Sequence, residues 1–176
     1  CVAGDTDDLA ARLRARALLP SGPLGERQLV ALKAQVTPFA TALREWREGE
    51  PATRAFELDI DGVRLYGHLE GLYPRGALRS RLDAIHGPAQ IAHGLDWLVL
   101  SALDDPRPLA QLAQWEEGPG VRERAAISVD RARAALRELL SLYREGQREP
   151  LPWQARSAWR WYDAPRGDDV AQLAAW

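Results

Sequence analysis

The hydrophobic pattern of the chain begins with helical spacing. Between residues 5 and 46 apolar side chains recur every three or four positions, which predicts two amphipathic helices. The first spans residues 5–17, and residues 19–25, rich in proline and glycine, form a connector to the second. Pro38 lies within the second helix and is expected to kink or interrupt it. The apolar stripe of that helix consists of Leu29, Leu32, Val36, Phe39, Leu43 and Trp46.

The spacing then changes from the helical period to strict alternation. Apolar residues alternate with acidic ones over residues 56–60, and the alternation resumes over residues 63–69 after Asp61-Gly62. This dipeptide favours a two-residue turn, so the segment predicts a β-hairpin. Its polar face would carry Arg64, Tyr66, His68 and Glu70. A turn at residues 74–76 then leads to a third strand over residues 77–84, which completes a meander.

Helices and strands alternate in the remaining sequence. A helix is expected at residues 89–103, and two strands at residues 109–115 and 121–127 around a turn at residues 118–120. Ser128 can cap a further helix, and Gly146 would close it. Its apolar face would consist of Ala132, Leu136, Leu139, Leu140 and Tyr143.

The order of these elements predicts an α/β (α+β) fold in which helices flank a central mixed sheet of about five strands. Three parts are expected: a helical segment at residues 1–52 that packs on the core, an α/β core at residues 53–150, and a Trp- and Pro-rich extension at residues 151–176. The chain ends on Trp176 directly after an apolar helical pattern, so we expect a fragment of a longer polypeptide.

Composition narrows the class of protein. The length of 176 residues suits one domain with a buried core. Neither an apolar run of about 18 residues nor a signal-peptide pattern is found, so we expect no membrane span and a cytoplasmic location. Cys1 is the single cysteine, which excludes an internal disulfide and a cysteine-based zinc site. A net charge of -2 lacks the basic signature of a domain that binds nucleic acid by itself.

The strand residues raise the question of nuclease chemistry. The PD-(D/E)XK nucleases have the same order of elements: a helix, a three-stranded meander, a helix and a strand. Their active site needs an acidic residue at the end of the second strand and an acid-x-lysine motif on the third strand. These acids hold Mg²⁺. Here Glu70 occupies the first position, whereas Arg79 and Arg81 replace the second acid and the lysine. A guanidinium about 4 Å from a divalent ion repels it by roughly 8 kcal/mol at an effective dielectric constant of about 20. We therefore expect a degenerate active site without metal or cofactor, with Glu70 a solvated strand residue paired to Arg79 or Arg81.

A divalent-metal-dependent nuclease remains the alternative, if the missing acid has moved to Glu57, Asp59 or Asp83. The three histidines, His68, His86 and His93, show no metal-binding spacing. A free-standing protein-interaction module is a third, weaker interpretation.

Two sets of residues could contact DNA. Arginines make the hairpin region locally basic, which fits either a solvated face or a patch that guides phosphates. The C-terminal segment mixes tryptophan with arginine, as channels for single-stranded DNA do, but core packing and a subunit interface explain the same residues. The candidates are Arg64, Arg75, Arg79 and Arg81 in the first set, and Trp153, Arg156, Trp159, Arg160 and Trp161 in the second.

Three sequence blocks resemble a known family. They are Leu-Leu-Pro-Ser-Gly-Pro-Leu-Gly at residues 18–25, Val-Arg-Leu-Tyr-Gly-His-Leu-Glu-Gly-Leu-Tyr at residues 63–73, and Leu-Tyr-Arg-Glu-Gly-Gln-Arg-Glu-Pro-Leu-Pro at residues 142–152. They are distributed from residue 18 to residue 152, so the resemblance extends over nearly the whole chain, and the last block is the most specific. The sequence resembles the C-terminal, nuclease-like domain of RecC, the gamma subunit of exodeoxyribonuclease V (RecBCD).

The resemblance implies a scaffold without catalysis. Members of this family hold RecB-like and RecD-like subunits in a helicase-nuclease complex and guide DNA strands during double-strand-break repair and recombination, while RecB does the cutting. Arg79 and Arg81 agree with this loss of activity. The family's domain continues beyond a segment like residues 167–176, where this chain departs from it.

Overall fold

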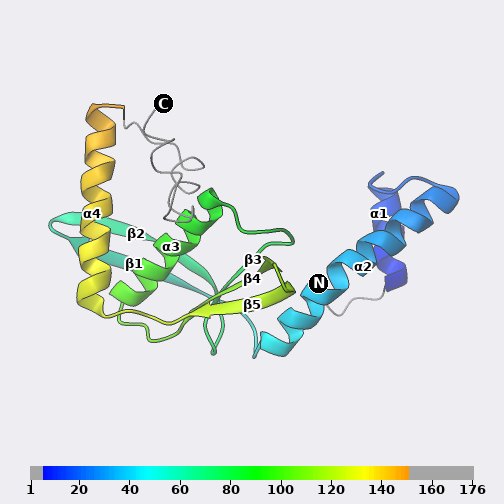
Figure 1. Cartoon of the computed structure of the whole chain (residues 1–176), viewed down its shortest axis with the longest axis horizontal. Helices are drawn as coiled ribbons and strands as arrows, with labels where there is room; N and C mark the ends of the chain where they lie inside the picture. Colours follow the sequence, from blue (N-terminus) through cyan, green and yellow to red (C-terminus); the bar gives the residue numbers. More distant parts are fainter. Residues whose placement is uncertain (1–5, 151–176) are drawn as a thin grey trace, which may run out of the picture.

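The fold is a five-stranded sheet with helices on both faces, seen here in a computed structural model that describes residues 6–150 (Figure 1). The strands lie side by side in sequence order, β1-β2-β3-β4-β5. The elements are α1 (Thr6–Ala15), α2 (Gly22–Trp46), β1 (Ala52–Ile60), β2 (Val63–Leu72), β3 (Ala77–Ser80), α3 (Gly87–Ala102), β4 (Leu109–Trp115), β5 (Gly118–Arg124) and α4 (Val129–Arg148).

The sheet is mixed because one connection crosses over it. β1, β2 and β3 form an antiparallel meander, and β4 and β5 form a second antiparallel pair. β3 and β4 run parallel, which requires a long connection, and α3 provides it. The prediction of a mixed sheet of about five strands flanked by helices is confirmed.

The β1–β2 hairpin forms where alternation predicted it. Asp61 and Gly62 both have positive φ angles, 52° and 77°, as a type I′ turn requires. The Asp59 carboxylate accepts a hydrogen bond from the Gly62 amide at 3.0 Å. The turn therefore pairs Ile60 with Val63 and fixes the register of both strands.

The main core lies between one face of the sheet and the helices α3 and α4. Side chains alternate along a strand, so Leu109 faces this core while Ala110 faces the other side. There Trp46, at the end of α2, packs with Tyr73 and Ala110. The N-terminal part of α2 extends away from the sheet with α1 beside it (Figure 1). The buried residues of the main core are Leu58, Ile60, Leu69, Leu72, Ala77, Val99, Leu100, Ala102, Leu109, Ala132 and Leu136.

Several helix boundaries differ from the predictions. The first helix ends at Ala15, because Ala17 has a φ of 53°. The second begins within the expected connector, at Gly22, and passes through Pro38 without interruption. Pro38 is exposed, so water can reach the carbonyl group that its missing N–H would have bonded. α4 likewise continues past Gly146 to Arg148.

Two strand boundaries also differ. The third strand ends at Ser80 rather than at residue 84, because β2 and β3 share the single register pair Leu72–Ala77 and then diverge. The turn expected at residues 118–120 lies instead at residues 116–117, and Gly118 already belongs to β5. β5 is an edge strand, where Pro119 removes no hydrogen bond that the sheet needs.

The amphipathic stripes are only partly buried. On α4, Leu139 and Tyr143 of the predicted apolar face are 39% and 64% exposed, because this half of the helix extends past the sheet (Figure 1). On α2, Leu32 and Val36 are exposed while Phe39 and Trp46 are buried. No helix among residues 6–150 combines the length and apolar character needed to cross a membrane.

Candidate functional site

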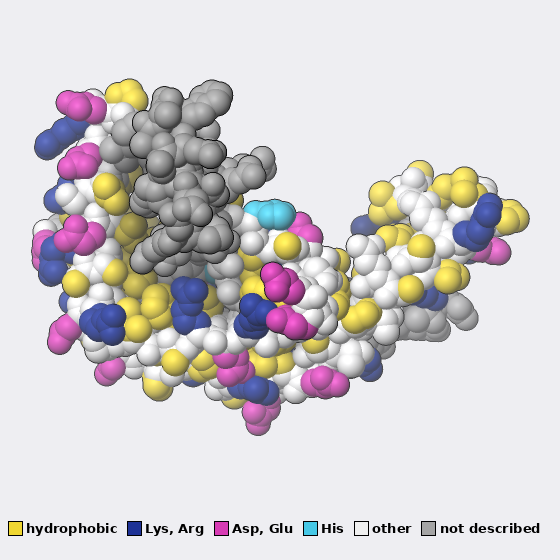
Figure 2. Space-filling view, viewed as in Figure 1, with side chains coloured by type: hydrophobic (Ala, Val, Ile, Leu, Met, Phe, Trp, Pro, Cys, Tyr) yellow, Lys and Arg dark blue, Asp and Glu magenta, His cyan; other side chains and the backbone are white. Residues whose placement is uncertain are grey.

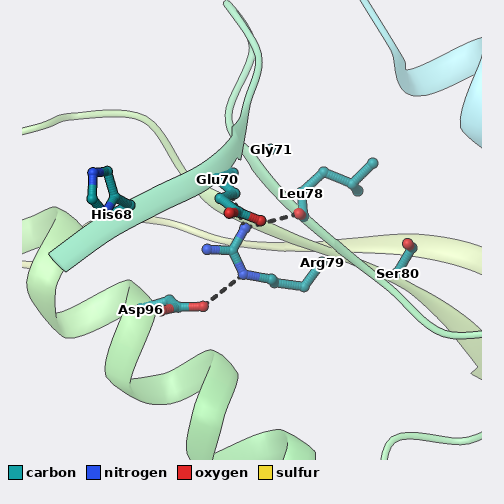
Figure 3. A pocket seen from close by; sticks show the side chains of 7 residues that line it. All are labelled: His68, Glu70, Gly71, Leu78, Arg79, Ser80 and Asp96. Carbon is teal, nitrogen blue, oxygen red and sulfur yellow. Dashed lines mark hydrogen bonds and ion pairs between the residues drawn. The ribbon is translucent and has the colours of Figure 1, made fainter. Parts of the chain in front are cut away.

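A cavity of about 390 Å³ opens where β2 and β3 separate (Figure 3). Arg54 pairs with Leu69 and Ala52 pairs with Leu72, so two residues of β2, Glu70 and Gly71, lie opposite one residue of β1. This β-bulge bends β2 away from β3, and Gly71 adopts a φ of 62° within it. We name this site the β2–β3 cleft; its lining residues are His68, Glu70, Gly71, Leu78, Arg79, Ser80 and Asp96.

Arg79 bridges the separated strands. Its Nη1 donates to the main-chain oxygens of Glu70 on β2, at 2.7 Å, and Leu78 on β3, at 3.0 Å. Its Nε donates to Oδ2 of Asp96 on α3 at 2.6 Å. Three elements are thus joined through one guanidinium, whose side chain is 16% exposed. A cation occupies the space between the strands and is neutralised by α3.

The Glu70 carboxylate is not paired with either arginine. Arg79 contacts the main-chain oxygen of Glu70 instead, and in the described part of the chain no hydrogen bond or ion pair engages the carboxylate. The predicted pairing of Glu70 with Arg79 or Arg81 is therefore wrong. The reason is that Asp96, which the sequence reasoning did not consider, reaches Arg79 from α3 (Figure 3). A single acid within the apolar pattern of residues 91–99 was the available signal.

Arg81 is engaged outside the cleft lining. Its Nε and Nη2 donate to the two carboxylate oxygens of Asp83 at 2.8 and 2.9 Å. This hydrogen bonding raises the pKa of Arg81 and lowers the pKa of Asp83. The two residues behind the degenerate nuclease pattern, Arg79 and Arg81, thus have different acidic partners.

Three polar side chains form a small hydrogen-bonded cluster between α3 and β4, beside the cleft. Gln111, buried on β4, places Nε2 at 2.8 Å from His93 Nδ1 and 3.3 Å from Gln90 Oε1. Because an amide nitrogen donates, Nδ1 must accept, which requires a neutral imidazole. Burial, and then the charge of Arg79, lower the pKa of His93 and favour this neutral form. The group satisfies buried polar atoms and has no metal-site geometry.

The acids proposed for a relocated metal site are each engaged by other groups. Glu57 is 3.3 Å from Arg64 on the neighbouring strand, Asp59 accepts from the hairpin turn, and Asp83 pairs with Arg81. Among residues 6–150, no three His, Cys, Asp or Glu side chains gather as a metal site would require.

The arginines predicted to contact DNA have different partners within the domain. Arg64 is exposed on β2, Arg79 faces α3, and Arg75 lies over the Trp46 ring at 5.6 Å and donates to Glu123. In Figure 2, basic and acidic side chains are interspersed over the visible face. The contacts of these arginines within the domain do not test their binding to DNA, which stays a prediction. Trp153, Arg156, Trp159, Arg160 and Trp161 lie outside the described residues.

A buried acid in the α3–β4 loop was missed from the sequence. Asp105, whose side chain is 6% exposed, accepts three hydrogen bonds from Arg107 and one from Arg54. Arg107 also donates to the main-chain oxygen of Tyr73, just beyond β2. These hydrogen bonds lower the pKa of Asp105 and raise the pKa of Arg107. The α3–β4 loop is thereby fastened to β1 and to the end of β2.

Comparisons with known proteins agree over nearly the whole chain. A family model described as the RecC C-terminal domain matches residues 2–166. The RecBCD enzyme subunit RecC of Mycolicibacterium smegmatis is 27% identical over 165 residues, which cover 90% of this chain and 15% of that protein. A protein of the same description from Mycobacterium tuberculosis is 25% identical over 163 residues, covering 91% of this chain and 15% of that protein. The chain thus spans 15% of the length of these curated relatives.

Proposed function

The chain belongs to the RecC C-terminal domain family, and from this premise we propose that it is a non-catalytic domain of a RecBCD-type helicase-nuclease complex. In this role it scaffolds RecB-like and RecD-like subunits and guides DNA strands during repair and recombination of double-strand breaks. Its relatives are named as subunits of the RecBCD enzyme, which supports a place in such a complex. A cytoplasmic location is part of the same proposal.

The position of Arg79 carries the proposal. The order α2-β1-β2-β3-α3-β4 supports a PD-(D/E)XK-like core, in which the divergence of the second and third strands is where acids would hold the metal. In this chain a guanidinium fills that place and is bonded to both strands and to Asp96. A divalent ion would have to displace a cation that already neutralises one of the nearby acids. In this proposal the nuclease-like fold has a structural role in the complex and no catalytic one.

A metal-dependent nuclease is the second candidate, and one observation favours it. Glu70 and Asp96 both line the cleft, so two acidic residues border the same cavity. Against it, one oxygen of Asp96 is held by Arg79 at 2.6 Å. Cutting of single-stranded DNA that needs Mn²⁺ and is lost in Glu70→Ala would establish the nuclease and remove the scaffold proposal.

Guidance of DNA is the part of the proposal that depends on the candidate arginines and tryptophans. If Arg64, Arg75 and Arg81 meet phosphates in the assembled complex, replacing each with alanine should reduce the salt slope of DNA binding by about 0.9 per lost contact. A slope equal to that of the wild-type complex would reject this role for the replaced arginine.

The scaffold role is tested by assembly. The complete subunit that carries this domain should form a stable complex with its RecB-like and RecD-like partners, measured by sedimentation velocity. The same subunit without the domain should assemble more weakly, and the complexes that do form should unwind DNA less processively. Equal assembly and equal unwinding with and without the domain would contradict the proposal.

A further inference from the structure

We propose that the β2–β3 cleft receives a basic side chain, arginine or lysine, from a partner subunit, and that Glu70 is its anionic partner. This inference rests on the proposed function, because the partner is a subunit of the same complex. The inference assigns a role to the degenerate site. The cleft that would hold a metal ion in a nuclease here binds a side chain of another protein subunit.

Glu70 is the available charge in the cleft. Asp96 is paired with Arg79, and Arg79 also uses Nη1 on two main-chain oxygens. The Glu70 carboxylate lines the same cavity, and none of the hydrogen bonds or ion pairs within residues 6–150 involves it. The β-bulge at Glu70 and Gly71 interrupts the regular alternation of β2 at this position, and Figure 3 shows Glu70 on β2 among the residues that line the cleft.

The charge balance of the lining favours a cation. Glu70 and Asp96 contribute two negative charges, and Arg79 contributes one positive charge. These three charged side chains therefore give the cleft lining one net negative charge. A DNA phosphate would meet the Glu70 carboxylate and be repelled, whereas an incoming guanidinium or ammonium group would be attracted.

Hydrogen-bonding geometry favours an organic cation over a metal ion. Mg²⁺ binds several oxygen ligands in a strict octahedron, while the described cleft offers one unengaged carboxylate beside a fixed guanidinium. A guanidinium needs only a carboxylate for a bidentate contact, and Glu70 provides one in the cleft. Arginine matches this carboxylate better than lysine, because its planar fork can meet both carboxylate oxygens.

The test compares two carboxylates on neighbouring strands of the complete subunit, bound to its partner subunits. Glu70→Gln keeps the shape of the side chain and removes its charge, and Glu70→Arg reverses the charge. Glu57→Gln is the matched control, because Glu57 is an exposed β1 carboxylate already paired with Arg64 within the domain. Dissociation of the subunits is followed by surface plasmon resonance at low and high salt.

We expect Glu70→Gln to dissociate about 10-fold faster than wild type at low salt, and Glu70→Arg faster still. The difference should narrow at high salt, and Glu57→Gln should behave as wild type. Equal dissociation rates of Glu70→Gln and Glu57→Gln would overturn the inference and leave the proposed function intact. A change in DNA affinity without a change in subunit dissociation would also overturn it. Failure of the wild-type subunit to assemble would overturn both proposals.

Discussion

Replacing Arg79 with alanine should lower the stability of the domain more than replacing any exposed arginine. The change removes the contact with Asp96 at 2.6 Å and the contacts with the Glu70 and Leu78 oxygens at 2.7 and 3.0 Å. Hydrogen bonds to charged groups contribute about 1.5–3 kcal/mol each. Their sum is an upper bound, because Asp96 is 36% exposed and water can enter the cleft once the guanidinium is gone.

We therefore expect Arg79→Ala to reduce the free energy of unfolding by about 2–4 kcal/mol. For a domain of this size the melting temperature should fall by roughly 5–15 °C. Urea denaturation of the wild-type and variant chains, followed by tryptophan fluorescence, measures the free energy directly. A double-mutant cycle with Asp96→Ala should give a coupling energy of about 1–2 kcal/mol between the two side chains.

The matched control is Arg64→Ala on β2. Arg64 is also a strand arginine in an ion pair, but its side chain is 72% exposed and its contact with Glu57 measures 3.3 Å. Exposed pairs of this kind contribute little, so the loss should stay below about 1 kcal/mol. If Arg79→Ala costs no more than Arg64→Ala, Arg79 does not hold the separated strands together.

Three other predictions concern the surrounding structure. Asp105→Asn should cost about 2–3 kcal/mol in urea denaturation. Hydrogen bonds from Arg107 lower the pKa of Asp105 in the folded protein. The stability difference between wild type and Asp105→Asn should therefore be complete above the pKa of Asp105 in the unfolded chain, and it should shrink as the pH falls through the pKa in the folded protein. A stability difference that stays constant down to about pH 2 would contradict the reasoning. In Gly25→Ala the new Cβ would lie 1.9 Å from the main-chain oxygen of Pro20, so the connector between α1 and α2 must move and α1 should become more sensitive to proteolysis. A rate of proteolysis equal to that of the wild type would refute the close approach. Gly94→Ala, which meets no atom within 4 Å in α3, should instead raise the free energy of unfolding by about 0.5–1 kcal/mol; a lower value would show that the helix needs glycine there.

The fold could be predicted where local chemistry decides it. Alternation and the Asp61-Gly62 turn fixed the β1–β2 hairpin, and the predicted strand at residues 109–115 has the bounds of β4. Where neighbours in space decide, prediction failed. β3 ends early because the bulge at Gly71 turns β2 aside, and the Leu139 end of the α4 stripe is exposed because the sheet does not extend that far.

In the candidate site, too, features that depend on local sequence could be predicted, whereas contacts between distant parts of the chain could not. Arg79 could be recognised from its place on the third strand, because a cation there is incompatible with a metal ligand. The partner of Arg79 could not be recognised from the sequence. Asp96 lies 17 residues later in the chain and comes close to Arg79 only because α3 crosses over the sheet. Asp105 follows the expected helix at residues 89–103, and only the fold shows it bonded to Arg54, 51 residues earlier.

The most direct test of the central claim is a Mn²⁺ titration of the wild-type chain by isothermal titration calorimetry, with the melting temperature recorded in parallel. If Arg79 fills the place of a metal ion, the titration should give no saturable heat and the melting temperature should not change. Saturable binding that raises the melting temperature and disappears in Glu70→Ala would contradict the claim.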